Sequence, residues 1–155
     1  PMKRETIDIG RLLEQTLGEM DEELCAFGFQ LKKDYPLTGM LVLCDGLHMH
    51  RVFQNLFDNA LKYACPQTRI FIHAIQRSDQ FCEIRIRNTS RVPLDFDPEE
   101  ITKRFVRGEK ARTGEGSGLG LAIAKTYTES CGGQFHIVIE DDCFIAVVCL
   151  PSITS

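Results

Sequence analysis

Hydrophobic residues recur at helical spacing in three long stretches of the chain. Apolar residues three, four, seven and eight positions apart predict an amphipathic helix from about Asp8 to Ala26. A second helix follows Asp45, a good N-cap residue, and is expected to end before Pro66. A third is expected from about Ser117 to Cys131, where a pair of glycines follows. Each helix has one apolar face that we expect to be buried.

Between these helices, apolar and polar residues alternate, which predicts half-buried strands. The strands come in adjacent pairs, an order typical of an α+β fold with a mostly antiparallel sheet. We therefore expect one domain with two layers, in which a mixed, mostly antiparallel sheet is covered by helices on one face. The expected strands are Phe29–Tyr35 and Met40–Cys44, Ile70–Ala74 and Cys82–Ile86, and Phe135–Ile139 and Phe144–Leu150.

Regular periodicity weakens between Asn88 and Gly116. Within this segment a cap at Asp97, followed by proline, predicts a short helix through Phe105, with Glu100 placed for a capping box. The concentrated positive charge fits either a solvated surface loop or a lid that closes over phosphates. A loop of roughly 25 residues is long for a simple connection. The basic residues are Lys103, Arg104, Arg107, Lys110 and Arg112.

The composition is that of a soluble globular protein. With 155 residues, 43% hydrophobic and 26% charged, the chain is large enough for one domain with a proper core. The net charge of -4 gives no electrostatic reason to expect nucleic acid or an acidic membrane surface as a partner. No apolar run approaches the ~20 residues that span a bilayer, and no signal peptide opens the chain. Seven cysteines without a CxxC pair argue against a disulfide framework and a zinc site, and favour a reducing, cytoplasmic compartment.

The predicted helix after Asp45 has two different faces. One is the apolar stripe expected to be buried, and the other is polar at steps of three and four residues. Asparagine is a mediocre helix former because its side chain competes for backbone hydrogen bonds, so two in register favour a binding surface. A solvated face is the alternative. The polar stripe consists of Arg51, Asn55, Asn59 and Lys62, and Tyr63 follows it.

A glycine-rich turn directly precedes the third helix. Gly116, Gly118 and Gly120 would let the backbone approach a ligand, and the helix start offers unpaired N–H groups to a phosphate. The turn is not a P-loop, because no lysine with serine or threonine follows. It is not a dinucleotide fingerprint either, because Leu121 takes the place of the third glycine and no strand precedes. A flexible loop is the alternative, which the interleaved leucines make less attractive.

Three segments, in this order, resemble the sequence boxes of a known family. Asn55–Tyr63 (NLFDNALKY) resembles the N box, Arg104–Gly108 (RFVRG) the F box and Gly116–Leu121 (GSGLGL) the G2 box of the ATP-binding catalytic domain of sensor histidine kinases. These kinases share the Bergerat-type ATP fold of the GHKL superfamily. The resemblance covers nearly the whole chain and implies that residues 1–155 form a single two-layer Bergerat-type sandwich.

The resemblance also implies roles for individual residues. Asn59 would ligate a Mg²⁺ ion that bridges the ATP phosphates, with Asn55 assisting directly or through water. Lys62 would reach the phosphates, and Tyr63 would pack near the adenine. Arg107 would be the catalytic residue that approaches the γ-phosphate. The other nucleotide contacts would come from the glycine-rich turn, at Gly116, Gly118, Leu119 and Gly120.

Two positions depart from patterns within the superfamily. The histidine kinases usually have a DxGxG segment whose aspartate accepts a hydrogen bond from the adenine amino group, but residues 88–93 here contain neither glycine nor an acid. We expect Asn88 to substitute, because its carbonyl can accept from the amino group and its NH₂ can donate to a ring nitrogen. In the ATPase members a glutamate lies four residues before the magnesium asparagine. Asn55 takes its place and cannot act as a general base, which favours holding ATP for transfer over hydrolysing it.

The phosphoacceptor histidine of the family lies on a separate helical hairpin. None of the histidines here has its sequence context, so we expect structural roles for His48, His50, His73 and His136. The resemblance implies a catalytic domain that does not autophosphorylate alone. Its partners would be the hairpin of the parent kinase and, through it, a response regulator, on the cytosolic side of a membrane-anchored receptor. The alternatives are a degenerate nucleotide-dependent interaction module without phosphotransfer and an anti-sigma-type serine/threonine kinase.

Overall fold

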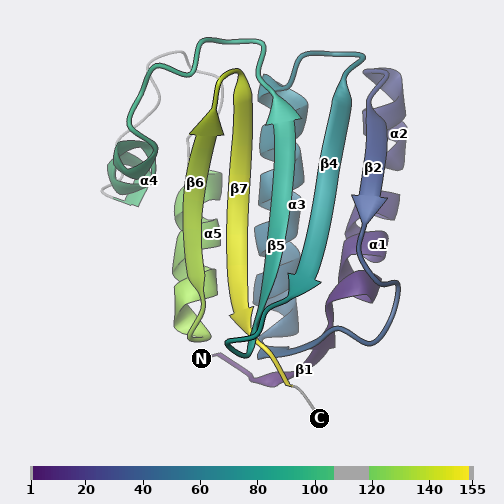
Figure 1. Cartoon of the computed structure of the whole chain (residues 1–155), viewed down its shortest axis with the longest axis vertical. Coiled ribbons are helices and arrows are strands. Elements are labelled where there is room, and N and C mark those ends of the chain that lie inside the picture. The colour runs from purple at the N-terminus through teal and green to yellow at the C-terminus, as the bar shows by residue number, and fades with distance from the viewer. Residues whose placement is uncertain (1, 107–118, 154–155) are drawn as a thin grey trace.

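A computed structural model describes residues 2–106 and 119–153, with the side chains of 103–106 and 119 left out (Figure 1). Most strands in this part of the chain come in adjacent pairs separated by helices, an order typical of α+β folds. The elements are β1 (Glu5–Asp8), α1 (Ile9–Glu19), α2 (Asp21–Ala26), β2 (Gln30–Asp34), β3 (Leu41–Cys44), α3 (Gly46–Tyr63), β4 (Arg69–Gln76), β5 (Phe81–Thr89), α4 (Pro98–Val106), α5 (Leu119–Ser130), β6 (Gln134–Glu140) and β7 (Cys143–Pro151).

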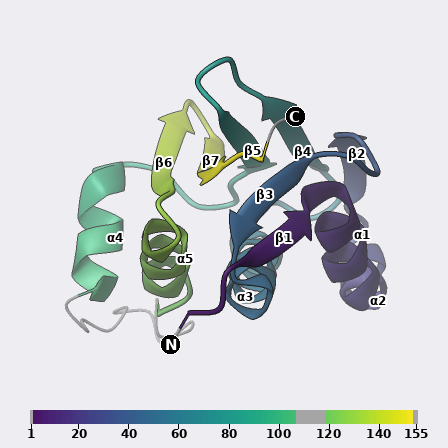
Figure 2. The same ribbon diagram turned by 90° about the horizontal axis from the view of Figure 1, so that it is seen from below.

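The main sheet has five strands in the order β2-β4-β5-β7-β6. β2 runs parallel to β4, and the other neighbouring pairs are antiparallel. Helices α1, α3 and α5 lie together on one face of this sheet (Figure 2). The predicted two-layer α+β fold, with a mixed and mostly antiparallel sheet, is confirmed.

Strands β2 and β3 follow each other along the chain, as predicted, but they do not pair with each other. β2 pairs with β4, where Gln30 lies opposite Arg69, whereas β3 pairs with β1, where Cys44 lies opposite Glu5. β1 was not predicted, because its four residues are too few to show the alternation of apolar and polar residues that indicates a strand. Strand partners are chosen by long-range packing, which local sequence does not encode.

The helix predicted from Asp8 to Ala26 ends at Gly28 as expected, but it is interrupted at Met20. Gly28 has φ of 74°, and the bonds from its N–H to the Cys25 carbonyl and from Phe29 N–H to the Leu24 carbonyl form a Schellman motif. The predicted helix from Asp8 to Ala26 is divided in two, because Met20, with φ of -107° and ψ of 8°, leaves helical geometry.

Helix α3 begins where its cap predicts and lies at the centre of the core. The Asp45 carboxylate accepts hydrogen bonds from the N–H groups of Leu47 (3.0 Å) and His48 (3.1 Å). Phe53 and Phe57 are fully buried, and each contributes on the order of 1.5–3 kcal/mol by leaving water. The apolar stripe therefore fixes the rotation of α3 about its axis. The buried residues of α3 are Met49, Val52, Phe53, Leu56, Phe57 and Ala60.

Candidate functional site

The polar stripe of α3 lies at the edge of the core, beside α5. Asn55 and Asn59 are half-buried, whereas Arg51 and Lys62 are exposed. Helix α5 packs along α3 in the same layer (Figure 2). The apolar stripe thus holds the two asparagine amides at a sheltered boundary between two helices.

The first turn of α5 meets this stripe directly. The Asn55 side chain donates from Nδ2 to the Gly120 carbonyl at 3.4 Å. A Cβ added to Gly120 would lie 3.5 Å from the Asn55 Cβ and 3.7 Å from its Cγ. Within the described part of the chain, the Asn59 side chain forms no hydrogen bond, so its amide oxygen is free to accept a ligand. The start of α5 therefore lies directly against the polar stripe at Asn55.

Lys62 lies at the exposed side of the same helix. Its Nζ is 3.1 Å from Asp58 Oδ2, one turn earlier, and the two side chains are 46% and 52% exposed. An ion pair this exposed contributes only ~0–1 kcal/mol, because water screens it. The ammonium group can exchange this partner for another anion at little cost.

Asn88 is a buried amide with an unpartnered donor. Only 3% of its surface is exposed, and it lies on the helix-facing side of β5, between Ile70 and Phe144 of the neighbouring strands. Among the described residues, its Nδ2 atom finds no hydrogen-bond acceptor. A buried N–H group left unpaired costs about 1–3 kcal/mol. Such an atom fits a site whose partner is a ligand.

The segment after β5 closes the end of α3. Arg91 donates from Nε and Nη2 to the Lys62 carbonyl at 3.0 and 2.7 Å, and its backbone N–H donates to the Tyr63 carbonyl at 2.9 Å. Cys65 N–H donates to the Thr89 carbonyl at 2.8 Å. These bonds bring the half-buried Tyr63 to the end of the strand that carries Asn88.

Arg91 is a site-shaping residue that was not predicted from the sequence. Basic side chains are known to satisfy carbonyls at the C-terminal ends of helices. Here the helix end lies 29 positions earlier in the chain, so only the fold brings the two together. Within residues 88–106 no residue has a positive φ, so this segment uses no glycine-only conformation.

The structure describes only some of the predicted site residues. Asn55, Asn59, Lys62, Tyr63 and Asn88 gather around the C-terminal half of α3 and the end of β5, and Gly120 joins them from α5. The backbone of Leu119 begins α5. Arg107, Gly116 and Gly118 lie outside the described residues.

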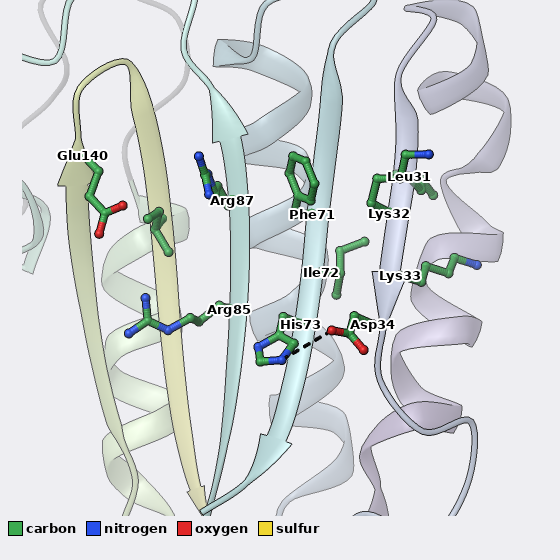
Figure 3. A pocket seen from close by; sticks show the side chains of 11 residues that line it. Leu31, Lys32, Lys33, Asp34, Phe71, Ile72, His73, Arg85, Arg87 and Glu140 are labelled. Carbon is green, nitrogen blue, oxygen red and sulfur yellow. Dashed lines mark ion pairs between the residues drawn. The ribbon is translucent and has the colours of Figure 1, made fainter.

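A depression of about 470 Å³ lies on the opposite face of the sheet, away from these residues (Figure 3). Several of its polar groups already have partners: His73 Nε2 is 3.5 Å from Asp34 Oδ2, and Arg85 Nε is 3.0 Å from Glu83 Oε2. The Arg87 guanidinium lies 5.6 Å from the centre of the Phe71 ring. This face is a paired, solvated surface, and none of the predicted site residues lines it.

Three of the four histidines have structural partners. His48 stacks on Tyr127 of α5, with ring centres 4.0 Å apart, and so links α3 to α5. His50 Nε2 is 2.7 Å from Glu19 Oε1, which links α3 to α1. His73 pairs with an aspartate of β2. These contacts agree with the structural roles predicted for them.

Comparison with known proteins agrees with this geometry. A family model described as histidine kinase-, DNA gyrase B- and HSP90-like ATPase matches residues 44–152. The chain is 32% identical over 130 residues to the adaptive-response sensory kinase SasA of Synechococcus elongatus, covering 83% of this chain and 33% of the relative. It is 31% identical over 142 residues to the swarming motility regulation sensor protein RssA of Serratia marcescens, covering 88% and 29%.

The fold has close matches among solved structures. The catalytic domain of histidine kinase ThkA superposes with a TM-score of 0.83 at 17% identity, covering 97% of this chain and 98% of the other. The mycobacterial sensor histidine kinase MprB superposes with a TM-score of 0.79 at 21% identity, covering 99% and 100%. The chain belongs to the family of histidine kinase-, DNA gyrase B- and HSP90-like ATPases. Within that family, its relatives and structural neighbours are sensor histidine kinases.

None of the described helices is both long and apolar enough to cross a membrane. The chain spans about a third of the length of the curated relatives it matches.

Proposed function

We propose that this domain binds Mg²⁺-ATP between α3, the start of α5 and the end of β5, and donates the γ-phosphoryl group to a histidine on a separate helical hairpin. The proposal rests on the observation that α3, the start of α5 and the end of β5 lie together. Asn55 of α3 contacts Gly120 of α5 at 3.4 Å, and the end of α3 is bonded to the end of β5, where Asn88 has a buried, unpartnered amide.

The chemistry of the donor set suits this ligand. Amide oxygens of Asn59 and Asn55 are hard ligands, and Mg²⁺ commonly takes one or two protein ligands with phosphates and water completing its shell. When bound, the ion neutralises charge on the phosphates. Lys62 leaves its weak pair with Asp58 and reaches the same phosphates. Backbone N–H groups around Gly120 add donors at the positive end of a helix.

The residues of the site also indicate the type of reaction. Asn55 carries no group that removes a proton from water at neutral pH, so the site holds ATP for another nucleophile. Tyr63 packs near the base, beside Asn88. From the family resemblance we assign Arg107 to the γ-phosphate, and Gly116, Gly118 and Leu119 to the phosphate cradle; the catalytic step is then mainly positioning and charge stabilisation.

The relatives suggest where the missing nucleophile lies. They are sensor kinases about three times as long as the matched region. We propose that the parent protein supplies a histidine-bearing dimerisation hairpin, that a response regulator docks on that hairpin, and that residues 1–155 form the catalytic domain on the cytosolic side of a membrane-anchored receptor.

Calorimetric titration tests the nucleotide site. A nonhydrolysable ATP analogue is titrated into the domain with and without Mg²⁺, and Asn59→Ala is expected to remove the magnesium dependence of binding. Gln54→Ala, on the same helix outside the polar stripe, is the matched control and is expected to bind as the native domain does. Magnesium-dependent binding that persists in Asn59→Ala means that the metal assignment is wrong. No binding up to millimolar nucleotide favours an interaction module instead.

Phosphotransfer is tested separately. The domain is mixed with the histidine-bearing hairpin of the parent protein and γ-labelled ATP. Acid-labile, base-stable label on the hairpin is the expected product, because phosphohistidine has this stability. Acid-stable label on serine or threonine would instead favour the anti-sigma type of kinase.

A further inference from the structure

The amide of Asn88 carries an inference about which purines the site accepts. We propose that the site binds 6-oxopurine nucleoside triphosphates, such as those of hypoxanthine and guanine, about as well as it binds ATP. The inference rests on the proposed function, because it concerns the base end of the same site. It deepens that function by naming the substrate class.

The position of Asn88 makes its amide a selective element rather than a surface group. It shares a register with Ile70 and Phe144, which are 0% and 8% exposed, and all three face the helical layer. In the part of the chain that the structure describes, Nδ2 has no acceptor. Polar atoms in such surroundings are nearly always hydrogen-bonded. The base of a nucleotide would supply the acceptor that this N–H group lacks.

The hydrogen-bonding capacity of an amide decides which bases fit. Adenine presents an amino donor at position 6 beside a ring nitrogen that accepts, whereas a 6-oxopurine presents a carbonyl acceptor beside a ring N–H that donates. The amide of Asn88 contains one donating and one accepting group, and a half-turn about its last bond exchanges them. Either base edge can then form two hydrogen bonds with the same side chain.

A carboxylate at position 88 would behave differently. Its two oxygens only accept, so at either base edge one oxygen pairs with the donor and the other faces an acceptor, which is the ring nitrogen of adenine or the carbonyl oxygen of a 6-oxopurine. Specificity in such sites comes from the group left unpaired or repelled, rather than from the group that binds. Asparagine at this position removes that repulsion for both kinds of base.

Calorimetry with ATP and inosine triphosphate tests the inference, because the two nucleotides differ only at the base edge in question. With Mg²⁺ present, the two dissociation constants of the native domain are expected to agree within about threefold, since each base forms the same number of bonds with the amide. In Asn88→Asp, both constants are expected to rise about tenfold, because with either base the carboxylate loses one of the two hydrogen bonds and meets a repelled acceptor.

The possible failures can be told apart. If ATP binds and inosine triphosphate binds more than about tenfold more weakly to the native domain, the inference is wrong and the proposed function stands. If neither nucleotide binds, the proposed function fails first. The native ratio decides the matter even if Asn88→Asp does not fold.

A spectroscopic measurement checks whether Asn88 itself reads the base. In ¹H–¹⁵N spectra, the side-chain NH₂ pair of Asn88 is expected to shift when either nucleotide is added. An unchanged pair during saturating binding would mean that a buried water, rather than the base, is the partner of Nδ2, and would overturn the inference.

Discussion

Replacing Gly120 with alanine separates the stability of the fold from the function of the site. The added methyl group would lie 3.5 Å from the Asn55 Cβ, which is an ordinary van der Waals contact. Packing therefore does not require glycine here, although α5 begins only one residue earlier. In a helix, alanine is favoured over glycine by up to about 1 kcal/mol. Gly120→Ala is expected to unfold at the same urea concentration as the native domain, or at a higher one.

Nucleotide binding is expected to respond in the opposite direction. The methyl group lies 3.7 Å from the Asn55 Cγ, against the amide that the proposed function assigns to the metal. It also narrows the approach of phosphates to the backbone N–H groups of this turn. We expect the affinity for a nonhydrolysable Mg²⁺-ATP analogue to fall about tenfold, equivalent to ~1.4 kcal/mol.

Two measurements on one sample decide the outcome: urea unfolding followed by circular dichroism, and calorimetric titration of the analogue. Undiminished affinity in a fully folded Gly120→Ala variant would refute the reasoning, because the first turn of α5 would then lie away from the ligand. A large loss of stability would refute the packing argument instead.

Two further predictions concern stability. Gly10→Ala is expected to lower the free energy of unfolding by about 2 kcal/mol, because the new Cβ would lie 2.0 Å from the Pro36 carbonyl oxygen. Gly18→Ala in the same helix has nothing within 4 Å of the new Cβ, and it is expected to leave the free energy of unfolding unchanged or to raise it. Equal urea midpoints for the two variants would contradict this. Hydrogen bonds from the backbone, that of Lys3 first, lower the pKa of Asp45. The ionised Asp45 side chain therefore stabilises the folded domain above the unfolded pKa of about 4, and this stabilisation is lost as pH falls through the lower folded pKa. The native domain is expected to lose more stability between neutral and acidic pH than the Asp45→Asn variant. Equal losses in the two proteins would count against this.

The parts of the fold that sequence predicted are those governed by near neighbours in the chain. The Asp45 cap, the apolar stripe of α3 and the Gly28 terminus each depend on residues within one or two turns. Such interactions form in any context that allows the helix. The break at Met20 could not be predicted in this way, because the apolar residues keep their helical spacing on both sides of it.

The candidate site was predictable to a similar extent. Asn55, Asn59 and Lys62 could be placed on one face because a helix repeats every 3.6 residues. The contact of Asn55 with Gly120 joins residues 65 positions apart, and the cap that Arg91 gives to α3 joins residues 29 apart. No local pattern contains either contact.

By itself, the sequence determined most of the elements and the faces of α3, because helical periodicity, capping and turn formation are short-range effects. Only the tertiary structure decided that β2 pairs with β4 instead of β3, and that Asn88 is buried between Ile70 and Phe144 with an unpartnered Nδ2 among the described residues. Both outcomes depend on which strands lie side by side. That choice is made by the burial of apolar surface across the whole sheet, and so the burial of Asn88 and its unpartnered donor became visible only in the folded chain.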